Sequence, residues 1–174
     1  MTPSLDALDF DAWLAENGPK LKPPVGNKEI FPGQQDFIVM VVGGPNQRTD
    51  FHVDPYEEVF YQLKGTMHVD VQTPQGRASV EIGPGQMWVL PRFMPHSPQR
   101  PEAGSIGLVF ERPREHGLTE HFQWYCLECN HLIYDVELQV TDIVVDLPPV
   151  FEKFYGSDSA RTCAQCGALH PGKG

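Results

Sequence analysis

Two imidazoles and one carboxylate in this chain have the residue types and the spacing of a metal site: His52, Glu58 and His96. In an extended segment, His52 and Glu58 have the same side-chain parity and can both point inward, whereas Glu57 would point away. Pro55 allows the backbone to bend between them. Two neutral imidazoles and one carboxylate leave coordination positions open, as in the ligand set of non-haem Fe(II) oxygenases. The three residues therefore predict a catalytic metal centre.

Four cysteines form a second candidate metal site. They occur as two C-x2-C pairs, Cys126 with Cys129 and Cys163 with Cys166, separated by residues 130–162. Two closely spaced thiolate pairs are the expected ligands of a tetrahedral site. Two disulfides are the alternative, which a reducing cytosol disfavours, and the surrounding sequence lacks the thioredoxin-like context of a redox-active pair. Iron and zinc both accept four sulfur ligands, so the spacing leaves the metal open.

Composition limits the class of protein. With 174 residues, the chain is long enough for one domain with a sizeable core. Its 17 prolines and 16 glycines are spread between apolar runs, as in a turn-rich all-β fold. The formal charge of −10 argues against nucleic acid or an anionic membrane as a partner and favours a small molecule. The sequence has neither a membrane-spanning apolar run nor a signal-peptide pattern, so we expect a cytoplasmic protein.

The elements that must position these residues are mostly strands. Apolar runs bounded by glycine and proline predict strands at residues 36–43, 58–64, 66–73, 78–82, 86–90, 105–111 and 132–140. Strands at this spacing indicate a sandwich or a barrel. One helix is predicted at residues 9–17, where Asp9 can cap the first turn, and another at residues 147–155 with prolines at its start.

Two stretches of the sequence bear on the metal site. Prolines at 91, 95, 98 and 101 surround His96, and because proline cannot sit in a central ladder, His96 is predicted at a strand end or in a stiff loop. In the predicted strand 105–111, Glu111 shares a face with the small residues Gly107 and Val109. Its carboxylate is therefore expected to face a cavity.

Taken singly, a histidine or a glutamate is more often an ordinary hydrogen-bonded or solvated residue than a metal ligand. The spacing of His52, Glu58 and His96 is what favours a metal site. The pattern H-x-D-x3-E-x6-G begins at His52, and G-x5-P-x4-H ends at His96. Together they resemble the two motifs of the cupin barrels, which implies a double-stranded β-helix, or jelly-roll, barrel. Asp54 stands where many cupins carry a further ligand histidine, and Arg100 stands where the second motif often has asparagine. These departures argue for three protein ligands.

Further motifs make the resemblance more specific. They are RTDFH ending at His52, EVFYQL from Glu58, HSPQRPEAGS from His96, Glu111 followed by arginine, WYC ending at Cys126, and the two cysteine pairs themselves. In these motifs the chain resembles the bacterial 3-hydroxyanthranilate 3,4-dioxygenases, over nearly its whole length beyond the first twenty residues. The resemblance implies a ring-cleaving enzyme that converts 3-hydroxyanthranilate and O2 to 2-amino-3-carboxymuconate semialdehyde, on the kynurenine route to quinolinate and NAD.

The same resemblance implies residue roles and partners. His52, Glu58 and His96 would hold catalytic Fe(II), and the four cysteines a second, rubredoxin-like iron that is not catalytic. Arg48, Arg100 and Glu111 would bind substrate and take part in catalysis, with Arg48 also near O2. The family further suggests a homodimer. We expect a barrel with an N-terminal capping helix at residues 1–120 and a four-cysteine extension at residues 121–174, within one compact domain.

Three alternatives remain open at the level of sequence. Another cupin dioxygenase, acting on an aminophenol or a catechol, would keep the three ligands but need not keep the two arginines and Glu111 together. A non-catalytic cupin binding protein would need no open metal positions. A zinc ribbon for docking a partner would place zinc between the four cysteines.

Overall fold

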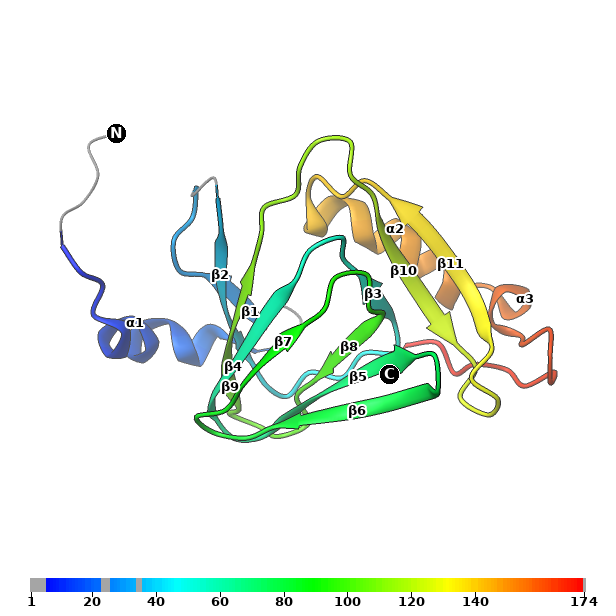
Figure 1. Ribbon diagram of the computed structural model, residues 1–174, viewed down its shortest axis with the longest axis horizontal. Coiled ribbons are helices and arrows are strands. Elements are labelled where there is room, and N and C mark those ends of the chain that lie inside the picture. The colour runs from blue at the N-terminus through cyan, green and yellow to red at the C-terminus, as the bar shows by residue number, and fades with distance from the viewer. Residues whose placement is uncertain (1–5, 23–25, 34–35, 174) are drawn as a thin grey trace.

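The computed structural model describes residues 6–22, 26–33 and 36–173, and its framework is a pair of antiparallel sheets (Figure 1). The five-stranded sheet has the order β1 (Asn27–Glu29), β2 (Ile38–Gly43), β9 (Ile106–Glu111), β4 (Glu58–Lys64) and β7 (Met87–Leu90). The six-stranded sheet has the order β11 (Leu132–Leu138), β10 (Glu120–Tyr125), β3 (Phe51–Val53), β8 (His96–Gln99), β5 (Met67–Thr73) and β6 (Gly76–Ile82). The predicted all-β fold is confirmed.

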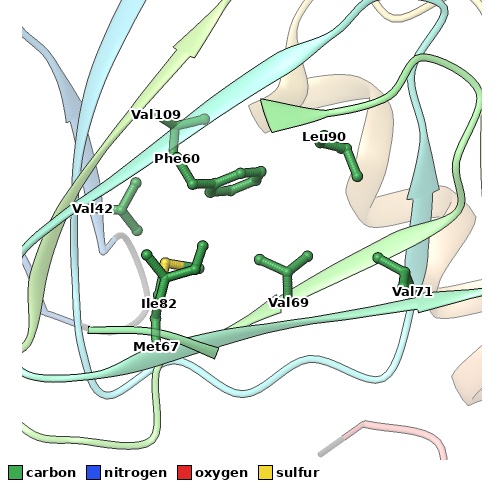
Figure 2. Close-up of a cluster of buried hydrophobic side chains, with 8 residues drawn as sticks. All are labelled: Val42, Phe60, Met67, Val69, Val71, Ile82, Leu90 and Val109. Carbon is green, nitrogen blue, oxygen red and sulfur yellow. The ribbon is translucent and has the colours of Figure 1, made fainter. Parts of the chain in front are cut away.

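The main core lies between the two sheets (Figure 2). Phe60 and Val109 come from the five-stranded sheet, and Met67 and Val69 come from the six-stranded one. In β5 the buried residues alternate with partly exposed ones, because successive side chains of a strand point to opposite faces. The alternation read from the sequence therefore identifies the inner face of the barrel.

A second core joins the end of the six-stranded sheet to the C-terminal helices. Helix α2 (Ile143–Tyr155) packs across β10 and β11, as Figure 1 shows, and α3 (Asp158–Arg161) follows it. Trp124 of β10 is fully buried and stacks on Phe154 with ring centroids 4.5 Å apart. The helix therefore covers the strands that extend the barrel sheet toward the cysteine unit.

The N-terminal helix α1 (Phe10–Asn17) has the predicted cap, since Asp9 Oδ1 accepts from the backbone N–H of Ala12 at 2.9 Å. It continues into a short 3-10 helix, η1 (Gly18–Lys20). Lys28 of β1 donates to Asn17 Oδ1 at 2.6 Å. This contact attaches the helix to the edge of the five-stranded sheet.

Two local predictions were wrong in part. Helix α2 begins at Ile143, so Pro148 and Pro149 lie inside it. The extra turn forms because the carbonyl of Asp142 accepts from the N–H groups of Val145 and Asp146. Pro98 lies in the inner strand β8, between β3 and β5, against the expectation that proline is excluded there. The strand tolerates it because β8 pairs with β3 only through His96 and His52, and His96 is at a strand end as predicted.

The boundary predicted between residues 120 and 121 falls at the start of β10, which pairs with β3 of the barrel. The division into two parts stays a prediction. Among the described residues, no helix has both the length and the apolar character that crossing a membrane requires.

Candidate metal centre and substrate cavity

Three strands bring the predicted metal ligands together. His52 lies in β3, directly opposite His96 of β8, and Glu58 is the first residue of β4 in the other sheet. His96 Nε2 lies 3.1 Å from Glu58 Oε1, and His52 Nδ1 lies 3.8 Å from the same oxygen. All three side chains are buried, while Glu57 is exposed. The side-chain parity deduced from the sequence therefore agrees with the observed geometry.

The polar atoms of this group fit a cation. Glu58 Oε1 is buried without a properly oriented hydrogen-bond donor among the described residues. His96 Nδ1 lies 3.1 Å from the carbonyl of Met94, to which it can donate, and this leaves the Nε2 lone pair facing Glu58. Burial alone would raise the pKa of Glu58, but His96, His52 and Arg48 lower it to about 2. An anionic oxygen and two imidazole nitrogens thus converge on one point.

A cavity of about 930 Å³ opens beside the three residues and is lined by both sheets and by α2. Phe60, Val109 and Phe122 contribute apolar walls. Arg48, Arg100 and Glu111, the residues singled out by resemblance, all line the same cavity. The structure therefore gathers every predicted residue of the barrel site around one space that can hold a small molecule.

Arg48 and Arg100 are held in different ways. Arg48 forms an ion pair with the buried Asp50, in which Arg48 Nε lies 3.2 Å from Asp50 Oδ1. Gln99 accepts from the Arg48 N–H and donates to its carbonyl, so the backbone is fixed as well. Arg100 is 1% exposed, and its Nε and Nη2 atoms have no hydrogen-bond partner within the described part of the chain. Burial lowers its pKa to about 10.

A buried guanidinium with unpartnered N–H groups is costly unless a ligand anion completes it, because removing a charge from water is unfavourable. Arg100 is therefore suited to a planar carboxylate, which its two N–H edges can grip. Glu111 lies on the cavity side of β9 with Val109, as its strand parity predicted. Burial and the neighbouring charge of Glu58 raise the pKa of Glu111 to about 8.

Sequence reasoning missed several contributors to this site. Glu120 is 3% exposed and contacts His52, but its strand β10 was not predicted. The alternation of Glu120 with Phe122 and Trp124 was the available signal for a strand with an inward carboxylate. Lys173 also lines the cavity, and Thr49 Oγ1 donates to the carbonyl of Gly172 at 2.7 Å. No sequence pattern indicated that contact with the C-terminal segment.

The four cysteines meet at the far end of β10 and β11. Sγ of Cys126 lies 3.5 Å from Sγ of Cys166, and Sγ of Cys129 lies 3.6 Å from Sγ of Cys163. A disulfide requires about 2.05 Å, whereas four sulfurs about 2.3 Å from a tetrahedral metal lie roughly 3.8 Å apart. The observed spacing therefore favours a tetrathiolate metal site over two disulfides.

The two cysteine pairs have the same backbone geometry. The N–H of Cys126 donates to the carbonyl of His131, and its carbonyl accepts from Asn130. In the second pair, Cys163 makes the equivalent bonds with Ala168 and Gly167. Asn130 and Gly167 both have positive φ, of 59° and 77°. Two equivalent turns thus present two thiols each toward one centre, as a metal knuckle requires.

The fold and the site define a barrel of two antiparallel sheets whose candidate metal centre opens onto a cavity with two arginines and a carboxyl group. The family model described as 3-hydroxyanthranilic acid dioxygenase matches residues 3–155. The chain belongs to this family.

Curated relatives agree with this assignment. A 3-hydroxyanthranilate 3,4-dioxygenase of Burkholderia lata is 52% identical over 95% of this chain and 95% of its own length. A protein of the same name from Jannaschia sp. is 50% identical over 97% of this chain and 93% of its own. Among solved structures, a cupin-2 domain containing protein from Shewanella frigidimarina is 16% identical, with a TM-score of 0.49 over 62% of this chain and 95% of that one.

Proposed function

We propose that this protein is a 3-hydroxyanthranilate 3,4-dioxygenase, which opens the aromatic ring with O2 to give 2-amino-3-carboxymuconate semialdehyde. Both oxygen atoms enter the product and the C3–C4 bond breaks, so no external reductant is needed. The observation that carries the proposal is the buried side chain of Arg100, whose Nε and Nη2 have no hydrogen-bond partner among the described residues and which lines the same cavity as the three-residue metal group. A substrate with a carboxylate on an aromatic ring satisfies the guanidinium, and the apolar walls accept the ring.

His52, Glu58 and His96 would hold Fe(II). When bound there, iron would supply open positions for the amine and hydroxyl of the substrate and electrons for the reaction with O2. The protein ligands lie on three strands of the two sheets, so the barrel itself holds them in place.

The remaining side chains orient the substrate and move its proton. Arg100 would grip the substrate carboxylate bidentately, and Arg48, fixed by Asp50, would face the reacting side of the ring where O2 enters. Glu111 would accept the hydroxyl proton as substrate binds and return it later. Its pKa of about 8 lies near neutral pH, where a group that both accepts and donates a proton is most effective.

We also propose that the four-cysteine unit holds a second iron, with zinc as the alternative. This metal would stabilise the packing of α2 and would take no part in the reaction. We further propose a cytoplasmic homodimer. Met87 and Val89 support self-association, because both are more than half exposed, at 62% and 51%, on the edge strand β7.

The deciding experiment uses anaerobically Fe(II)-loaded protein, 3-hydroxyanthranilate and air, with product absorbance and O2 uptake followed together. We expect uptake of one O2 per ring opened, and loss of both signals in the His52→Ala variant. Turnover of aminophenols or catechols that lack the carboxylate would instead favour another cupin dioxygenase. Absence of O2 uptake despite bound iron would favour a binding protein.

A further inference from the structure

Glu120 contacts the outer side of the metal group. It is the first residue of β10, which pairs antiparallel with β3 so that Phe122 lies opposite His52. Glu120 Oε2 lies 2.8 Å from His52 Nε2, and both side chains are buried. The other ring nitrogen, Nδ1, is the one that faces Glu58. The imidazole is therefore held between two carboxylates, one on each nitrogen.

Glu120 is itself fixed by a second charged group. Arg114 Nε lies 2.5 Å from Glu120 Oε1, and Arg114 Nη2 lies 3.3 Å from Oε2. This fork leaves Glu120 neutralised on one side and free to accept one N–H on the other. Phe122 also packs against His52, since its ring stacks on the imidazole with ring centroids 5.1 Å apart and an interplanar angle of 17°.

We propose that Glu120 is a positioning residue that sets the tautomer and ring orientation of His52. The His52 Nε2–H donates to Glu120, which leaves the lone pair of Nδ1 directed toward Glu58 and His96 for the metal. Metal-bound histidines commonly donate their second N–H to a carboxylate, which fixes the ring and makes the ligand nitrogen more basic. This inference rests on the proposed metal centre and adds a residue outside the three ligands.

The same geometry argues against a metal on the Glu120 side of the ring. His52, Asp54 and Glu120 also bring ligand atoms within 4.8 Å of one another. Arg114 already neutralises Glu120 there, and Asp54 Oδ1 accepts from the N–H of Tyr56 at 2.6 Å. On the other side, Glu58 Oε1 is unpartnered among the described residues. The lone pairs still available therefore lie toward Glu58.

Metal affinity provides the first test. Mn(II) is the probe, because it prefers oxygen and nitrogen donors and leaves the four-cysteine unit alone, and the EPR signal of free Mn(II) reports binding. We expect Glu120→Ala to raise the Mn(II) Kd by about 10–100-fold. Glu120→Gln should restore part of the affinity, since its amide oxygen can still accept the Nε2–H. Glu137→Gln, an exposed change on β11, is the matched control and should leave the Kd unchanged. A Kd within twofold of wild type in Glu120→Ala would overturn the proposal.

A second test uses the wild-type protein, so its outcome does not depend on whether a variant folds. Long-range proton–nitrogen NMR spectra of the Zn(II)-loaded wild-type protein should show His52 with Nδ1 bound to metal and Nε2 protonated. The opposite assignment would overturn the proposal. Both tests are independent of turnover, so a protein that passes them but fails to consume O2 with 3-hydroxyanthranilate would refute the proposed function and leave the role of Glu120 standing.

Discussion

Replacing Arg100 by methionine should stabilise the ligand-free protein and impair catalysis. The side chain is 1% exposed, and Nε and Nη2 have no partner within the described residues. Burial lowers its pKa to about 10, well below the ordinary value of arginine, which corresponds to a penalty of roughly 3 kcal/mol for the charged form. The penalty is present in full at pH 7, because that pH lies below both pKa values. An apolar side chain of similar volume removes it.

The two expected effects have opposite signs. Relief of about 1–3 kcal/mol should raise Tm by roughly 2–10 °C in a protein of this size. Loss of two charged hydrogen bonds to the substrate carboxylate, at about 1.5–3 kcal/mol each, should lower kcat/KM by roughly 10²–10⁴-fold. Most of this loss should appear as a higher KM, with the content of metal unchanged.

Thermal unfolding of the ligand-free protein and initial-rate kinetics of the Fe(II)-loaded enzyme measure the two effects separately. Arg112→Met is the matched control, because Arg112 is exposed, stacks on Tyr56 and lies outside the cavity. It should change neither quantity appreciably. A less stable Arg100→Met protein with an unchanged KM would show that the guanidinium serves the fold, and would refute its assignment as a carboxylate site.

Three other perturbations test separate parts of the structure. Phe60→Ala should cost about 3–5 kcal/mol in urea unfolding, because it empties a fully buried position between the sheets; a loss below 1 kcal/mol would contradict that packing. Glu111→Gln should flatten the pH dependence of stability in the metal-free protein. With a folded-state pKa of about 8, the native carboxyl contributes to stability in full below pH 4.5 and loses that contribution as pH rises through 8. Equal stability profiles of the variant and the wild type from pH 5 to 9 would refute this. Cys163→Ser should release the C-terminal metal, measured by elemental analysis, and lower Tm while the other metal stays bound; unchanged metal content would contradict the four-sulfur site.

The sequence was sufficient for features that depend on local periodicity. Alternation in β5 identified its buried face, and parity selected Glu58 over Glu57. Both follow from the two-residue repeat of a strand, which needs no knowledge of the partner strands. The cysteine spacing likewise predicted that the four sulfurs lie together, because each C-x2-C pair is built from adjacent residues of the chain.

Features that depend on strand pairing required the tertiary structure. Pro98 fits an inner strand only because β8 meets β3 through a single residue pair. No sequence pattern around Arg100 indicates that its Nε and Nη2 are buried without a partner among the described residues. Glu120 reaches His52 because β10 pairs with β3, across a separation of 68 residues. The sequence by itself determined which side chains share a face, whereas only the folded sheets decided which faces meet, because contacts between distant strands depend on register and not on local pattern.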